Sequence, residues 1–170
     1  YLYGGRLARL ATRFLYYFTR NTLQGSRRNI HAHYDLGNAF YRLWLDKTMT
    51  YSAALFDDEQ ESLESAQHRK YDRMLDRLDS SSGRLLEVGC GWGGLAERAL
   101  HHHDYAIKGI TLSTEQHAFA TRRLNGHANI AIEDYRHQQG HYDHIISIEM
   151  FEAVGEKFWP IYFKKMASLL

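Results

Sequence analysis

The chain has 170 residues, which is enough for one domain with a sizeable core, since a chain of this length buries roughly two-thirds of its unfolded surface. Its composition is globular, with 44% hydrophobic and 24% charged residues, and its net charge of +1 argues against general binding to nucleic acid. The single Cys90 excludes an internal disulfide, and the sequence has no secretory signal pattern and no apolar run of about 18 residues. We therefore expect a cytoplasmic protein.

Residues 1–28 form a basic segment that contains six arginines and no acidic residue. Leucine and aromatic side chains lie between the arginines. As an amphipathic helix, this segment predicts either binding to an anionic membrane surface or packing against the protein's own domain. We separate this N-terminal helical segment from a main domain at residues 29–170.

The main domain begins with a turn and a short helix. His31 and His33 do not predict a metal site, because no further histidine or cysteine follows at ligand spacing. Residues 35–38 have turn chemistry, and apolar side chains at helical spacing predict a short helix over residues 40–44. Residues 48–56 are rich in hydroxyl groups and predict an extended or looping segment.

Residues 57–78 predict a structural helix. Acidic residues crowd its first turns and basic residues follow, which complements the helix dipole, and an apolar stripe runs along one side. The stripe consists of Leu63, Ala66, Tyr71, Met74, Leu75 and Leu78. Residues 79–83 predict a linker, because they contain aspartate, three serines and glycine.

A glycine-rich turn follows an apolar run at residues 84–88. The next residues, 95–100, are apolar at helical spacing, so the stretch predicts a strand, a tight turn and a helix. Glycines permit positive φ and close backbone approach, so that a ligand can lie against the strand end and the helix N-terminus. We predict a nucleotide-binding corner here, with a glycine turn that binds no ligand as the alternative.

The residues around the glycines discriminate between two nucleotides. Gly89, Gly91 and Gly94 match a dinucleotide fingerprint, which also requires an acidic residue at the end of the second strand. Residues 109–113 contain no acidic residue there. Glu87 instead precedes the glycines, and the pattern Glu-x-Gly-x-Gly-x-Gly resembles the first motif of class I S-adenosylmethionine methyltransferases.

Strands and helices alternate along the rest of the chain. Residues 105–110 and 128–132 predict strands, and residues 144–148 predict a strand buried on both faces. Ser113 is a candidate N-cap for a helix that ends near Asn125. The alternation predicts an α/β fold with a doubly wound parallel sheet.

Six sequence blocks follow one another in a fixed order from Asn29 onward. They are residues 33–38, 49–52, 87–93, 109–116, 134–136 and 147–155. Together they resemble the cyclopropane-fatty-acyl-phospholipid synthase family. The resemblance implies a Rossmann-like class I methyltransferase domain at residues 29–170, with S-adenosylmethionine as its cofactor.

The resemblance also implies a reaction at the cis double bond of an unsaturated phospholipid acyl chain. The alkene attacks the sulfonium methyl group, and a base then removes a proton from the resulting carbocation to close a cyclopropane ring. Such a site must align both reactants and exclude water. A methyl-branched or methylene product, another small-molecule or lipid substrate, and a non-catalytic lipid-binding protein remain as alternatives.

The family match further implies roles for individual residues. In related enzymes the base is bicarbonate, and Glu152 matches a glutamate that holds it, while Ile148 matches a backbone contact. Glu149 competes with Glu152 for this role. Ala53 stands where many members have cysteine, and Ala153 where many have histidine. The implied cofactor-binding residues are Tyr34, Tyr51, Ser52, Glu87, Gly89, Gly91, Thr111, Leu112, Gln116, Asp134 and Tyr135.

The last stretch, residues 159–170, predicts a helix. We predict four strands before it, whereas methyltransferase domains of this class have seven, so we expect a domain that is incomplete at its C-terminus. The 170 residues alone are then expected to be inactive without another segment. We also expect peripheral association with the inner membrane face and consider a homodimer as the candidate assembly.

Overall fold

The structure is a computed structural model that describes residues 37–170. The basic segment at residues 1–28, both His31 and His33, and the predicted cofactor contact Tyr34 lie outside this range. No helix between residues 37 and 170 combines the length and the apolar content that crossing a bilayer requires.

Within the described range, four parallel strands form a sheet in the order β3-β2-β1-β4. The strands are β1 (Ser82–Val88), β2 (Asp104–Thr111), β3 (Asn129–Ile132) and β4 (His144–Ile146). β1 is central: it pairs along its whole length with β2, while Leu85, Leu86 and Glu87 also pair with β4. The parallel α/β sheet predicted from the sequence is confirmed.

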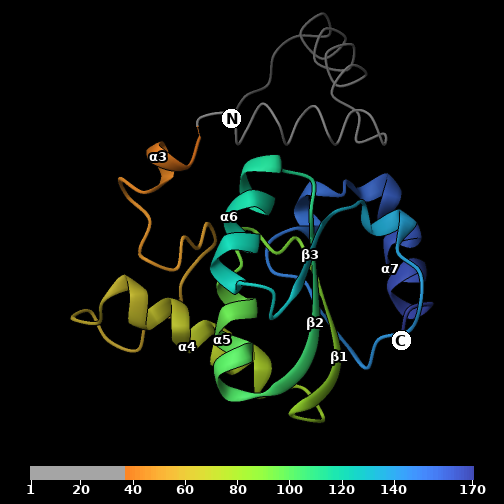
Figure 1. Ribbon diagram of the computed structural model, residues 1–170, viewed down its shortest axis with the longest axis horizontal. Helices are drawn as coiled ribbons and strands as arrows, with labels where there is room; N and C mark the ends of the chain where they lie inside the picture. The colour runs from red at the N-terminus through yellow and green to blue at the C-terminus, as the bar shows by residue number, and fades with distance from the viewer. Residues whose placement is uncertain (1–36) are drawn as a thin grey trace, which may run out of the picture.

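Helices cover both faces of this sheet. α4, α5 and α6 lie on one face and α7 lies on the other (Figure 1). The helical elements are α3 (Gly37–Tyr41), α4 (Leu63–Leu75), α5 (Gly94–His102), α6 (Thr114–Leu124), η1 (Tyr135–His137), η2 (Phe151–Ala153), η3 (Glu156–Phe158) and α7 (Trp159–Ala167). Because all four strands are parallel, their carboxyl ends lie at the same edge of the sheet.

Side chains of β1 enter two hydrophobic cores, because successive residues of a strand face opposite sides of the sheet. Leu85 packs among residues of α4, α5 and α6, whereas Leu86 and Val88 pack on the side of α7. Leu85 and Leu86 are both fully buried. Burial of each contributes about 1.5–3 kcal/mol, so the central strand is held firmly from both sides.

The helix predicted over residues 57–78 is shorter in the structure, where α4 starts only after Ser62. The Ser62 hydroxyl accepts a hydrogen bond from the backbone N–H of Ser65 and caps the helix. In the preceding turn, Asp58 accepts a hydrogen bond from the N–H of Gln60 at 2.7 Å. Such side chains bond the nearby backbone and compete with helix formation, so the acidic stretch forms turns.

The boundaries of α6 agree with the sequence, and those of β4 do not. Ser113 caps α6, and Asn125 ends it in the left-handed conformation with φ 45°. β4 ends at Ile146 instead of continuing to Ile148. The hydroxyl of Ser147 donates to the backbone oxygen of Val88 at 3.0 Å, and the chain leaves the sheet at this point. Ile148 therefore lies in the loop beyond the strand.

Candidate functional site

A cavity of about 920 Å³ lies at the carboxyl ends of β1 and β2, the edge at which open parallel sheets bind ligands. Its walls come from the loop before α4, from α4, from the turns after β1 and β2, and from residues 133–136 and 148–154. The fold thus brings together segments that are far apart in the sequence.

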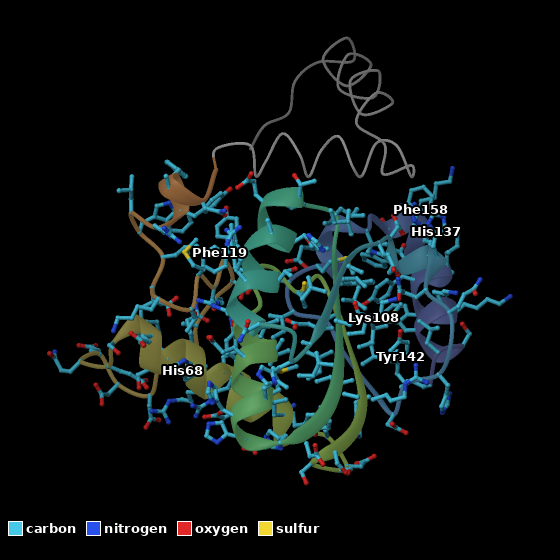
Figure 2. The ribbon with its side chains drawn as sticks, in the orientation of Figure 1. His68, Lys108, Phe119, His137, Tyr142 and Phe158 are labelled. Carbon is cyan, nitrogen blue, oxygen red and sulfur yellow. The ribbon has the colours of Figure 1, made fainter. Side chains whose placement is uncertain are left out.

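An aromatic cluster supports the loop that precedes α4. Tyr41, Met49 and Trp92 are buried together, and Phe119 of α6 packs against them on the side that faces this loop (Figure 2). Arg123, also on α6, donates to two backbone oxygens of the loop at 2.6 and 2.7 Å. These contacts hold the loop against α6, so this wall of the cavity is preformed.

The turn after β1 requires glycine for two reasons. Gly89 and Gly91 have φ of 85° and 53°, in the left-handed region that glycine adopts readily. A Cβ atom on Gly89 would also lie 3.1 Å from Cγ of Met150. The backbone N–H groups of Gly89 and Cys90 both donate to the oxygen of Ile110 at 3.0 Å, which fixes the turn to β2.

Glu87 is a buried carboxyl group at the end of β1. The residue is 6% exposed, lines the cavity, and its Oε2 has no hydrogen-bond partner among residues 37–170. Burial raises the pKa of this carboxyl to about 8. Unpaired buried carboxyl oxygens are rare, so this atom fits a ligand that brings a hydrogen-bond donor or a positive charge.

Polar side chains at the end of β2 are paired with one another. Thr111 donates to Oε1 of Gln116 at 2.7 Å, and its hydroxyl accepts from the N–H of Ser113 at 3.1 Å. Thr111 and Gln116 are buried and line the cavity together with Leu112. The N-terminal turn of α6 therefore presents an ordered polar wall.

Asp134 and Tyr135 form the next part of the wall. Both carboxylate oxygens of Asp134 accept from the guanidinium of Arg136, at 2.8 and 2.6 Å. Burial opposes the ionised form of Asp134, but the hydrogen bonds from Arg136 hold its pKa below the usual value. The Tyr135 ring packs against Tyr162 of α7 with centroids 5.1 Å apart. This part of the cavity wall therefore consists of the Asp134–Arg136 ion pair and the neighbouring ring of Tyr135.

Contacts from α4 hold the loop that contains Ser52 and Ala53. Lys70 Nζ donates to the hydroxyl of Ser52 at 2.6 Å and to the backbone oxygen of Ala53 at 2.9 Å. Gln67 Nε2 donates to the backbone oxygen of Ser52 at 2.9 Å. Burial lowers the pKa of Lys70 to about 8, although the charge of Glu149 partly opposes this shift.

The segment after β4 brings two carboxylates to the cavity. Glu149 and Glu152 both line it, as does Ile148. Oε1 of Glu149 accepts a hydrogen bond from the backbone N–H of Ala53 at 2.8 Å. The backbone N–H of Ala53 is thus hydrogen-bonded to Glu149, and its backbone oxygen is hydrogen-bonded to Lys70.

The structure brings the predicted site residues together with two exceptions: Gly91 lies in the turn but does not line the cavity, and Tyr34 is outside the described range. The predicted residues that line it are Tyr51, Ser52, Glu87, Gly89, Thr111, Leu112, Gln116, Asp134, Tyr135, Ile148 and Glu152. Gln67 and Lys70 were not predicted as site residues, because the sequence pattern of this helix indicated only a structural role. The sequence feature that could have indicated them is that Gln67 directly follows Ala66, and Lys70 directly precedes Tyr71, in the apolar stripe.

Comparison with known proteins finds a family model and several relatives that match most of this chain. The model of the family described as mycolic acid cyclopropane synthetase matches residues 21–170. Tuberculostearic acid methyltransferase UfaA1 of Mycobacterium tuberculosis is 42% identical over 158 residues, which are 85% of this chain and 37% of the relative. Cyclopropane-fatty-acyl-phospholipid synthase of Escherichia coli K12 is 41% identical over 133 residues, 77% of this chain and 35% of the relative. The chain thus spans about a third of these relatives.

A solved structure matches at the level of the fold and of the sequence. The mycolic acid cyclopropane synthase CmaA1, complexed with SAH and CTAB, superposes with a TM-score of 0.81 at 33% identity. The match covers 85% of this chain and 53% of that protein. The described sheet and helices therefore form part of a class I methyltransferase fold, as the sequence analysis predicted.

Proposed function

Because this chain belongs to the mycolic acid cyclopropane synthetase family, we propose that the full-length protein transfers a methyl group from S-adenosylmethionine to a double bond of a lipid acyl chain. Within this class, the proposed substrate is the cis double bond of an unsaturated phospholipid, and the proposed product carries a cyclopropane ring. The observation that carries the proposal is the buried carboxyl group of Glu87 beside the glycine turn, whose Oε2 has no hydrogen-bond partner within residues 37–170.

The residues of the cavity fit S-adenosylmethionine. Glu87 and Gly89 would hold its amino-acid end, because an ammonium group supplies the donor and the charge that no group within residues 37–170 offers to Oε2 of Glu87. Thr111 and Gln116 would contact its middle, and Asp134 with Tyr135 would lie toward the adenine. A cavity of about 920 Å³ is within the range of small-molecule sites. When bound, this cofactor supplies an electrophilic methyl group.

Apolar side chains in the same cavity support a lipid substrate. Trp44 and Phe56 line it and are 47% and 51% exposed, and Leu63, Ile148 and Met150 line it as well. Apolar walls bind an acyl chain and keep water from a carbocation, which water would otherwise hydrate. Glu152 contributes a negative charge to these walls, which stabilises positive charge that develops on the substrate.

The proposed place of action is the inner surface of a membrane. A substrate acyl chain belongs to a bilayer, and the sequence contains the arginine-rich residues 1–28. Basic residues near an anionic lipid surface each contribute about 1 kcal/mol of attraction. A vesicle sedimentation assay with anionic and with neutral lipids tests this part of the proposal.

The function is tested with the full-length protein, labelled S-adenosylmethionine and vesicles of cis-unsaturated phospholipid. We expect label in the lipid and an acyl chain that is heavier by one CH2 group in mass spectrometry. Vesicles of saturated phospholipid serve as the control and should remain unlabelled. Binding of SAH without transfer to any unsaturated lipid would assign the site to another class of substrate.

A further inference from the structure

Glu149 has an unusual backbone conformation. It is one of the non-glycine residues with positive φ, at 47°, a region in which a side chain is strained and glycine is not. Strained residues of this kind persist where the surrounding structure holds them, and they are concentrated at functional sites. The residue lies just beyond β4, on the wall of the cavity.

The carboxylate of Glu149 is hydrogen-bonded to the loop that contains Ala53. Its Oε1 accepts from the N–H of Ala53, at 2.8 Å, across 96 residues of sequence. Ala53 and Ala153 are the two positions at which this chain departs from many family members. The carboxylate has lone pairs beyond this one bond, so it retains the capacity to accept a proton.

A bicarbonate ion does not fit the arrangement around Ala53. The N–H donor of Ala53 is already bonded to Glu149. Glu149 and Glu152 both line the cavity, so an additional anion would meet two carboxylates. Lys70, the cation that interacts with Glu149, donates to Ser52 and Ala53 instead.

We propose that the Glu149 carboxylate is the base that accepts the proton lost by the lipid substrate, and that it replaces bicarbonate in this protein. The inference deepens the proposed function and rests on it. In the step concerned, the C–H electron pair of the carbocation forms the new carbon–carbon bond, and the proton passes to the carboxylate. Glu149 then releases this proton to solvent, which restores the base.

The competing interpretation is structural, because Glu149 also anchors the loop at Ala53. Two variants separate the alternatives. Glu149→Gln keeps an oxygen that accepts the Ala53 N–H but has no basicity. Glu149→Gly relieves the left-handed strain, removes the carboxylate that accepts from the Ala53 N–H, and leaves space for an external anion. Glu156→Gln is the matched control, because it also removes one carboxylate but at a residue that does not line the cavity.

The experiment measures methyl transfer by the full-length protein in CO2-free buffer, with and without added bicarbonate or formate. We expect the parent to be equally active in both, and Glu149→Gln to lose about 100-fold or more in rate, the usual contribution of a general base. SAH affinity of Glu149→Gln should stay within about 2-fold of the parent. Bicarbonate or formate should restore activity to Glu149→Gly, and Glu156→Gln should match the parent.

A second readout is the identity of the products. Without the base, the cation is expected to shift from ring closure toward open-chain products, which mass spectrometry separates. If the parent requires bicarbonate, or if Glu149→Gln keeps the parental rate and products, Glu149 is not the base. Either result leaves the proposed function in place. Joint loss of SAH affinity and activity in Glu149→Gln makes the residue structural and also overturns its assignment as the base. Absence of lipid methylation by the parent instead overturns the proposed function, and this inference with it.

Discussion

At the scale of single residues, Glu87 links the charge of the site to the stability of the protein. Its pKa in the folded chain is about 8, because burial penalises the ionised carboxylate, whereas the usual value is 4.5. The folded state therefore binds this proton more tightly than the unfolded state. Its contribution to stability is fully present below about pH 4.5 and is lost as the pH rises to about 8.

Replacing Glu87 with glutamine should remove this pH dependence. Each unit of pKa difference corresponds to about 1.4 kcal/mol, so the ligand-free parent should lose several kcal/mol relative to Glu87→Gln between about pH 5 and pH 9. Urea denaturation of both proteins at several pH values measures the difference in free energy of unfolding. A difference that stays constant across this range would contradict a pKa of Glu87 that burial raises.

The same residue predicts a proton released on ligand binding. At about pH 7 the Glu87 carboxyl is largely protonated, and an ammonium group at Oε2 favours its ionised form. Binding of SAH should then release close to one proton near pH 7 and almost none near pH 9.5. Calorimetry in buffers of different ionisation enthalpy counts these protons. The Glu87→Gln variant is the control, and proton release from it would rule out this explanation.

At the scale of elements, the start of α6 positions the polar wall of the cavity. The Ser113 hydroxyl accepts from the N–H of Gln116, and Gln116 in turn accepts from Thr111. Ser113→Ala should lower the free energy of unfolding by about 1 kcal/mol, which is typical for the loss of an N-cap, and should weaken SAH binding. Denaturation and calorimetry test both effects. Thr114→Ala, at the neighbouring exposed position, should change stability by less than about 0.5 kcal/mol.

Some elements were predictable because their signals are local. The glycine turn after β1 and the caps of α6 depend on residues a few positions apart, and both have the predicted form. The prediction that the helix over residues 57–78 begins at residue 57 was wrong, because α4 begins at Leu63. Acidic residues favour a helix N-terminus, but the same side chains also bond the backbone of a turn, and the sequence does not show which interaction prevails.

Contacts within the site were less predictable because they are distant in sequence. Glu87 and the glycines share one motif, so their proximity follows from the chain itself. The hydrogen bond from Ala53 to Glu149 joins residues on separate loops, and that from Lys70 to Ser52 joins a helix to a loop. Neither pair has a local pattern that indicates contact. Only the packing of α4 and the path of the chain beyond β4 bring them together.

At the scale of the whole molecule, one sheet separates two cores and positions the site where both meet. Leu75 of α4 belongs to the core on one face, and Met166 of α7 belongs to the core on the other. β1 contributes buried side chains to both cores, contains Glu87 next to its last residue, and leads into the glycine turn. The geometry of the cavity therefore depends on both faces of the sheet at once.

This arrangement predicts that the two cores unfold as one unit. In the full-length protein, Leu75→Ala and Met166→Ala should each cost about 2–5 kcal/mol, since both remove buried side chains. The sites lie on opposite faces without shared partners, so the double variant should equal their sum within about 0.5 kcal/mol. Chemical denaturation should show one transition for this domain in all variants, while Leu43→Ala, at a position that is 81% exposed, should behave as the parent. Two unfolding transitions in either variant would mean that the two faces of the sheet are stabilised independently. The cavity at the strand ends would then depend mainly on the face covered by α4, α5 and α6.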